Sequence, residues 1–316
     1  MKKSALRIMF LIALLLAAGL ISSAANNPIV YIRTEVGVIV VEVYQDKAPL
    51  TSANFLKYVD AKRYDDSIFH RTVTMANQPN NAVKIEVIQA AELPPEKCFA
   101  PIPLERTSVT GLKHLDGTIS MARNGPDTAT SSFFICIGDQ PELDFGGKRN
   151  NDGQGFAAFG KVVSGMERVK KIQQAPSEGQ TLKPPVKILS AGRPTGPEGV
   201  AVQHVLIAFK GSIPEETVTR SQDEAKALAL EIFERAKKGE DFDALVKKYT
   251  NDEYPGVYRM ANFGLPLNKE NKEYSRAGMV WSFGEVSFGL PVGGIGLAVY
   301  DPMSSKYGWH IIKRLE

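Results

Sequence analysis

The segment VQHVLIAF, Val202 to Phe209, and the segment YGWHIIKR near the end of the chain, Tyr307 to Arg314, share a pattern of β-forming apolar residues with one histidine. Such runs are typical of buried strands. The whole chain has four histidines, and His204 and His310 stand just before the apolar core of each run. We therefore expect two buried strands that each carry a histidine at a matching place.

Between these two runs the sequence predicts two amphipathic helices. In SQDEAKALALEIFERAKKG, Ser221 and Glu224 form a capping box, apolar residues recur at helical spacing, and Gly239 ends the pattern. A second helix is predicted over residues 241–249, with its apolar side chains on one face. The order of strand, two helices, short mixed elements and strand is typical of a small α+β domain whose first and last strands are neighbours.

The preceding part of the chain is dominated by short alternating segments. VYIRTEVGVIVVEVY, Val30 to Tyr44, contains two β-rich runs separated by Gly37, as in a hairpin. Helical spacing occurs at Thr51 to about Lys62 and at Gly165 to about Gln173. We expect mostly antiparallel sheet with two helices.

The length of 316 residues and the hydrophobic content of 43 % are enough for two domains. The segment GRPTGPEG, Gly192 to Gly199, is rich in proline and glycine and follows neither periodicity, which indicates a linker. We therefore predict a first domain over residues 29–193, a linker over residues 194–200 and a second domain over residues 201–316.

The N-terminal segment MKKSALRIMFLIALLLAAGLISSAANN has a basic start, an apolar run from Ile8 to Ile21 and small residues at its end. This layout is typical of a secretory signal peptide, here over residues 1–25 with cleavage after Ala24 or Ala25. The alternative is an uncleaved membrane anchor, but the run is short for a span of about 20 residues. We expect an exported protein, either periplasmic or secreted.

The three basic residues of the signal segment account for the whole formal net charge of +3. The balanced remainder offers no field for nucleic acid or an anionic membrane, so we expect neither as a partner, and membrane contact only if the signal segment stays uncleaved. Cys98 and Cys136 are too few for a disulfide framework and are not spaced as a metal pair. One disulfide and two separate thiols both remain open, and no metal site or cofactor is predicted.

Four ordered blocks in the first half resemble the cyclophilin family of peptidyl-prolyl isomerases. The blocks are IFHR (Ile68 to Arg71), VIQAA (Val87 to Ala91), DGTISMARNGPDTATSSFFICIGD (Asp116 to Asp139) and GFAAFGKVVSGMERVKKI (Gly155 to Ile172). The resemblance implies a mostly-β closed barrel of eight strands, capped by two helices and with a peptide groove on its face. It implies Arg71 as the catalytic arginine. The groove residues that it implies are Gln89, Ala122, Arg123, Phe134 and Phe159.

This half departs from the family pattern at three places. Glu86 stands where the family has a phenylalanine of the proline pocket, and Ser132 stands where a glutamine is usual. These two changes favour a groove that holds peptides without accelerating rotation. Near Glu142 and Leu143 there is no tryptophan of the kind found in cyclosporin-sensitive members, so we expect weak or no cyclosporin binding.

The second half resembles the parvulins, an unrelated family with the same reaction. The matching blocks are QHVLI (Gln203 to Ile207), GEDFDALVKKYTND (Gly239 to Asp252), RAGMVWSFGEVSFGLPVGGIG (Arg276 to Gly296) and YGWHIIKRLE (Tyr307 to Glu316). In that family the first and last strands place two histidines together beneath the active site, which here are His204 and His310. Asp252 matches the acidic or thiol position. Met279 and Phe283 match the apolar pocket that grips proline, and Tyr258 replaces a residue that is commonly leucine.

The chemistry explains why these residue types are needed. Rotation about an X-Pro bond crosses a barrier of roughly 18–20 kcal/mol because the planar amide is conjugated. A donor aimed at the proline nitrogen acts only in the twisted state, which is the differential binding that raises a rate. Arg71 suits this role because a guanidinium stays charged and presents its donors in a fixed fork. His204 and His310 are predicted to orient the second site and tune Asp252.

The sequence thus predicts an exported folding factor with two different prolyl-isomerase domains, a barrel followed by a small α+β domain with an antiparallel sheet. Its expected partners are proline-containing polypeptides that are unfolded or newly translocated. Two alternatives stay open, a non-catalytic peptide-binding chaperone and a scaffold that binds one native partner.

Overall fold

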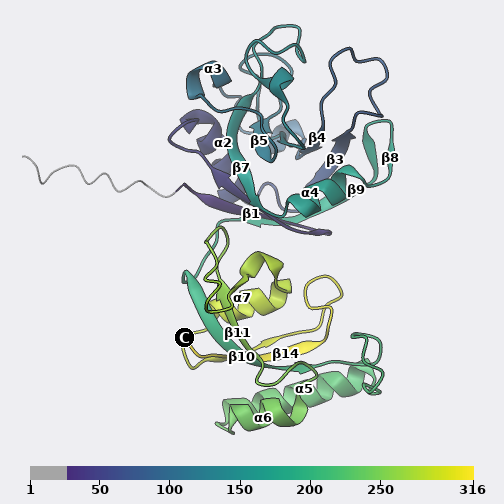
Figure 1. The fold of residues 1–316 in the computed structure, drawn as a ribbon, viewed down its shortest axis with the longest axis vertical. Helices are drawn as coiled ribbons and strands as arrows, with labels where there is room; N and C mark the ends of the chain where they lie inside the picture. Colours follow the sequence, from purple (N-terminus) through teal and green to yellow (C-terminus); the bar gives the residue numbers. More distant parts are fainter. Residues whose placement is uncertain (1–26) are drawn as a thin grey trace, which may run out of the picture.

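Two separate sheets organise residues 27–316, the part of the chain that the computed structural model describes. The predicted signal peptide, residues 1–25, lies outside the described residues. Figure 1 shows the two sheets in two bodies that follow one another along the long axis of the molecule. Among the helices of residues 27–316, none combines the length and the apolarity that a membrane span needs.

The first sheet is a closed antiparallel barrel. Its strands are β1 (Ile29–Thr34), β2 (Gly37–Val43), β3 (Ile68–Val73), β4 (Val87–Ala90), β5 (Thr118–Met121), β6 (Phe133–Cys136), β7 (Ala157–Ser164) and β9 (Thr181–Gly192), with the short β8 (Ser177–Glu178) added at the edge of β9. The spatial order is β1-β2-β7-β5-β6-β4-β3-β9, and β1 pairs with β9 to close the ring. Alternate residues of β1 are buried, as a half-buried strand requires. The predicted eight-stranded barrel is confirmed.

Two helices cap this barrel, at the places that the periodicity predicted. α2 (Pro49–Asp60) has proline in its first turn, where the missing N–H costs nothing, and it buries Phe55 and Val59 in the barrel core. α4 (Met166–Gln173) buries Val169 and Ile172 in the same core. The connecting loops contain α3 (Thr107–Thr110) and the single turns η1 (Pro95–Lys97) and η2 (Pro141–Leu143).

The second sheet has the spatial order β12-β11-β10-β14-β13. Its strands are β10 (Gly199–Ile207), β11 (Val257–Ala261), β12 (Tyr274–Ser275), β13 (Ile295–Ala298) and β14 (Trp309–Arg314). β10 and β14 are antiparallel neighbours, with Leu206 opposite His310 and His204 opposite Ile312. The prediction that the first and last strands of this half lie side by side is therefore confirmed.

Helices cover both faces of the second sheet. α5 (Gln222–Lys237) and α6 (Phe242–Tyr249) pack against Val205 and Ile207 of β10. The opposite face of β10 meets α7 (Trp281–Gly289), which the turn η3 (Arg276–Gly278) precedes. Successive strand residues point to opposite faces, so His204 is directed to the α7 side, where its ring lies 5.1 Å from that of Phe283. The predicted capping box of Ser221 and Glu224 is present.

Three structural details differ from the sequence predictions or add to them. β10 begins at Gly199, so the last two residues of the predicted linker 194–200 belong to a strand, because they pair with β11. α7 was not predicted, since glycine and aromatic residues within it give a weak helical signal. Both cysteines are free thiols, with Cys136 buried and Cys98 half-buried.

Aromatic contacts join the two halves. The ring of Tyr31 on β1 lies 5.3 Å from that of Phe263 and 5.2 Å from that of Trp281. The guanidinium of Arg33 lies 4.9 Å over the ring of Trp281. Figure 1 shows β1 at the edge of the barrel that faces the second half. The helix that carries Phe283 is thereby in contact with the barrel.

Candidate active sites

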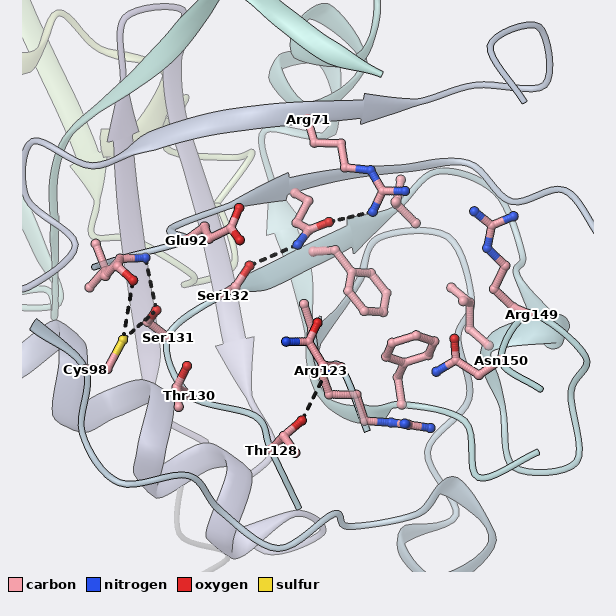
Figure 2. A pocket seen from close by; sticks show the side chains of 18 of the residues that line it. Arg71, Glu92, Cys98, Arg123, Thr128, Thr130, Ser131, Ser132, Arg149 and Asn150 are labelled. Carbon is pink, nitrogen blue, oxygen red and sulfur yellow. Dashed lines mark hydrogen bonds between the residues drawn. The ribbon is translucent and has the colours of Figure 1, made fainter. Parts of the chain in front are cut away.

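A cavity of about 790 Å³ opens on the face of the barrel, beside β3, β4, β5 and β6 (Figure 2). Its floor is an apolar cluster that is separate from the barrel core. The residues of this cluster that line the cavity are Ile85, Val87, Ala122, Phe134, Leu143 and Phe156. The rings of Phe134 and Phe156 meet edge to face at 5.3 Å, so the floor presents an aromatic corner.

Arg71 stands on the rim of this cavity and is held on two sides by neutral acceptors. Its Nη1 donates to Oε1 of Gln89 at 2.9 Å, and Gln89 faces it on the neighbouring strand β4. Its Nε and Nη2 donate to Oε1 of Gln180 at 2.9 and 2.6 Å. The one carboxylate among the lining residues, Glu92, is paired with His70 rather than with Arg71. The guanidinium is therefore fixed in direction while part of its donor set stays unused.

Ser132 strengthens this arrangement. Its Oγ accepts a hydrogen bond from Nε2 of Gln89 at 3.1 Å and donates to the carbonyl of Ala90 at 3.0 Å. Figure 2 shows the chain of contacts from Arg71 to Ser132 across the top of the cavity. A serine at this position thus orients the glutamine that orients the arginine, which argues against the expectation that Ser132 weakens the site.

Glu86 does not enter the cavity, and the prediction that it takes the place of a pocket phenylalanine is wrong. Its carboxylate accepts a hydrogen bond from Nε2 of Gln173 at 3.2 Å, on the side of helix α4. Its neighbours Ile85 and Val87 are buried and line the cavity instead, because adjacent residues in extended backbone point to opposite sides. The wall of the cavity that Ile85 and Val87 form is therefore apolar.

Phe159 is a second correction. It was predicted as a pocket wall, but it is fully buried in the barrel core, where its ring lies 5.0 Å from that of Phe55. The alternation of β7 turns Phe159 inward, while Phe156, just before the strand, reaches the cavity. Phe134 lines the cavity as predicted by the family resemblance.

Ala122 and Arg123 follow β5 and border the cavity. The amide of Ala122 donates to the carbonyl of Ser132 at 2.9 Å. The guanidinium of Arg123 is occupied by Asp152, at 2.7 and 3.0 Å, and by the carbonyl of Gly155. Arg123 can therefore offer a substrate its backbone, with its side chain fastened to the wall.

A second cavity, of about 330 Å³, lies between β10, β14 and α7. Its lining brings together all five residues predicted for this half. These are His204, Asp252, Met279, Phe283 and His310. Tyr258 also lines it, and its hydroxyl donates to Oδ2 of Asp252 at 2.8 Å.

The two histidines and Asp252 form one hydrogen-bonded row. Nε2 of His204 lies 3.0 Å from Oδ2 of Asp252, and Nδ1 of His204 lies 3.2 Å from Nδ1 of His310. A carboxylate only accepts, so Nε2 of His204 carries a proton. With both rings neutral, Nδ1 of His204 then accepts from Nδ1 of His310. This order leaves Nε2 of His310 unprotonated, and that atom is buried without a hydrogen-bond partner among residues 27–316.

The electrostatics of the row follow from these contacts. Burial, and then the neighbouring His204, lower the pKa of His310 to about 3, so this ring is neutral at neutral pH. The hydrogen bond from His204 holds the pKa of Asp252 well below its usual range; burial opposes this effect, and the bond from Tyr258 adds to it. Burial and the bond to Asp252 raise the pKa of Tyr258. The site therefore places one ionised carboxylate beside the apolar side chains of Met279 and Phe283.

Comparison with known proteins agrees with this geometry. Residues 29–193 match the family model for the cyclophilin type peptidyl-prolyl cis-trans isomerases. This chain belongs to the cyclophilin-type peptidyl-prolyl cis-trans isomerases. Residues 187–316 match the PPIC-type PPIASE domain, so the isomerase carries a rotamase domain behind its cyclophilin domain, as the sequence predicted.

Peptidyl-prolyl cis-trans isomerases of three bacteria are similar to part of this chain. The peptidyl-prolyl cis-trans isomerase of Acinetobacter baylyi is 36% identical over 186 residues, which cover 57% of this chain and 93% of the relative. Peptidyl-prolyl cis-trans isomerase A of Dickeya dadantii is 37% identical over 157 residues, 49% of this chain and 76% of the relative. Peptidyl-prolyl cis-trans isomerase B of Escherichia coli is 34% identical over 142 residues, 45% of this chain and 81% of the relative. The protein is therefore an isomerase enzyme.

Three contributors to the barrel site escaped the sequence analysis. Gln180 and Ile85 lie outside the matching blocks, and Phe156 lies inside one of them. Gln180 is 109 residues from Arg71 and reaches it only because β9 pairs with β3. The short polar stretch SEGQT, residues 177–181, was the sole sequence signal for it. Phe156 was visible inside a matching block, but its role was given to Phe159.

Proposed function

We propose that this isomerase is exported and that both of its cavities catalyse rotation about X-Pro bonds in unfolded or newly translocated polypeptides. Export is supported by the layout of residues 1–25. A role on unfolded chains is supported by the open barrel groove, because X-Pro isomerisation takes tens to hundreds of seconds without a catalyst and can limit folding.

One observation carries the proposal for the barrel. Arg71 is fixed by Gln89 and Gln180 at the rim of an apolar cavity, with neutral partners only. Three of the five N–H donors that a guanidinium has are engaged in this way, which leaves the others for a substrate. In the twisted state the proline nitrogen regains a lone pair, and a donor from Arg71 stabilises that state in preference to the planar one. The aromatic corner of Phe134 and Phe156 holds the ring and excludes water.

In the rotamase domain the ionised Asp252 has the corresponding role. Conjugation in the planar amide places partial negative charge on the carbonyl oxygen. A carboxylate beside that oxygen disfavours the conjugated form and so favours the twisted one. His204 and Tyr258 hold Asp252 in place by hydrogen bonds. Nδ1 of His310 donates to Nδ1 of His204, which keeps the proton of His204 on Nε2, facing Asp252. Met279 and Phe283 grip the proline ring, as the family resemblance implies.

The test is exchange between the cis and trans forms of an X-Pro peptide, followed by NMR with the full chain. The variants are Arg71→Ala, Asp252→Ala and the double variant, beside Arg168→Ala as a matched surface control. We expect each single variant to lose part of the acceleration, the double variant to lose nearly all of it, and Arg168→Ala to match the wild type. A double variant as active as the wild type would overturn the assignment. A domain that binds the peptide without accelerating its cis-trans exchange would be a peptide-binding domain without isomerase activity.

Export has a separate test. The full-length chain is expressed in a bacterial host, and the N-terminus of the mature protein is read by mass spectrometry after cell fractionation. We expect the mature chain to begin at Ala25 or Asn26 and to leave the cytoplasm. A chain that keeps residues 1–25 and stays in the cytoplasm would contradict this part of the proposal.

A further inference from the structure

Arg149 is a second guanidinium in the barrel cavity, on the loop between η2 and β7. Its Nη1 donates to Oε1 of Gln78 at 2.9 Å and to the carbonyl of Val83 at 2.7 Å, and both acceptors are neutral. Burial lowers its pKa. Among the described residues, no carboxylate forms a salt bridge with it, whereas the neighbouring Arg123 is paired with Asp152 at 2.7 Å. Arg149 is thus a half-buried cation without an anion.

Arg71 and Arg149 act on one another across this cavity. Figure 2 shows the guanidinium groups of both residues at the same end of the cavity, with Glu92 at the other end. Burial lowers the pKa of Arg71, and the charge of Arg149 lowers it further, while Glu92 has a smaller opposing effect. Two like charges in a partly desolvated site repel, and an anion placed between them adds two attractions that offset this repulsion.

We propose that Arg149 is a specificity residue of the barrel site, which selects X-Pro segments with an aspartate or glutamate next to the proline. A carboxylate fits because its two oxygens accept from guanidinium donors in a fixed geometry. Arg149 lines the same cavity as the aromatic corner of Phe134 and Phe156, so it is placed to meet an acidic side chain next to a proline bound in that corner. Asn150 lines the same end and adds a neutral polar neighbour. The inference rests on the proposed function of this groove.

The test uses five-residue peptides with a central proline and alanine elsewhere, in which aspartate, lysine or alanine stands directly before or directly after the proline. The full chain carries Asp252→Ala, so that only the barrel contributes, and NMR exchange gives the relative rates. We expect the aspartate peptide to be preferred over the lysine peptide by about three- to tenfold at one of the two positions, the size expected of a half-buried ion pair.

Variants of Arg149 separate charge from structure. Arg149→Met should bring the aspartate-to-lysine ratio close to one, Arg149→Lys should keep a large part of it, and the surface control Arg168→Met should leave it unchanged. Raising the salt concentration should reduce the ratio. A ratio near one in the wild type, or a ratio that Arg149→Met leaves intact, would overturn the proposal. A uniform loss on all peptides would show that Arg149 only supports the loop of Gln78 and Val83.

A binding measurement keeps this inference apart from the proposed function. Chemical-shift titration with the same peptides gives Kd values whether or not exchange is accelerated. If Arg71→Ala leaves exchange of the alanine peptide unchanged, the catalytic assignment fails. The preference of Arg149 for aspartate would still appear, or fail to appear, in the Kd ratio.

Discussion

The Nδ1 atoms of His204 and His310 lie 3.2 Å apart, on neighbouring strands, so that one proton is shared by two buried rings. Two protonated nitrogens could not face each other at this distance, and Asp252 already fixes the proton on the far nitrogen of His204. When both rings are neutral, the row is therefore compatible with one arrangement of protons.

A pH dependence of stability follows from this arrangement. The folded state holds the pKa of His310 at about 3, against an ordinary value near 6.5. As the pH falls from about 6.5 towards 3, the unfolded state binds a proton that the folded state refuses, so this contribution to the free energy of unfolding is present above that window and is lost within it. By pH 4.5 the second domain should lose about 2–3 kcal/mol for this reason.

Urea unfolding followed by tryptophan fluorescence measures this loss selectively, because Trp281 and Trp309 are the two tryptophans of the chain and both lie in the second half. We expect His310→Gln to flatten the dependence between pH 6.5 and 4.5. Tyr258→Phe, which changes the same row without removing a histidine, should keep the slope in this window. If the free energy of unfolding fell equally with pH in the wild type and in His310→Gln, His310 would take up its proton in the folded state.

The pairing of these histidines could be predicted from sequence because strand pattern, position and family resemblance all led to the same two residues. The barrel site could be predicted only in part. The match fixed Arg71 and Gln89, but Glu86 and Ile85 could not be told apart, because a longer loop precedes β4 and a shift of one residue exchanges the two sides of the strand. The contact of Gln180 with Arg71 could not be predicted from the sequence, since only the pairing of β3 with β9 brings the two residues together.

Gln180 should matter for catalysis through its hold on Arg71. Gln180→Ala removes the acceptor of two guanidinium donors, at 2.9 and 2.6 Å, and leaves the arginine in place but less fixed in direction. We expect kcat of the barrel half to fall by about three- to thirtyfold with a smaller change in KM, because a positioning loss acts mainly on the twisted state. The measurement is NMR exchange in the Asp252→Ala background. The exposed Gln174→Ala is the matched control, and a similar fall in both variants would contradict the positioning role.

Alanine substitutions of Phe159 and Phe156 should affect different properties, mainly stability for Phe159 and mainly peptide binding for Phe156. Phe159 is fully buried in the barrel core, so Phe159→Ala should lower the free energy of unfolding by about 3–5 kcal/mol. Phe156 lines the cavity and is only partly buried, so Phe156→Ala should cost less stability and raise KM for X-Pro peptides. Calorimetry and exchange kinetics on both variants check the assignment. A larger loss of stability from Phe156→Ala would reverse the two roles.

The contact between Tyr31 and Trp281 predicts that the barrel stabilises the second half. Tyr31 packs on Phe263 and Trp281 from across the domain boundary, and the guanidinium of Arg33 lies over the ring of Trp281. Aromatic pairs and a cation over a ring contribute about 0.5–1.5 kcal/mol each, so Tyr31→Ala should lower the stability of the second half by about 1–2 kcal/mol. Tryptophan fluorescence reads this directly, since the substitution lies in the barrel and both probes lie in the other half. Tyr31→Phe keeps the ring and should keep the urea midpoint of the wild type. An unchanged midpoint in Tyr31→Ala would show that the two halves are stable independently, and that α7 holds Phe283 in the pocket without help from β1.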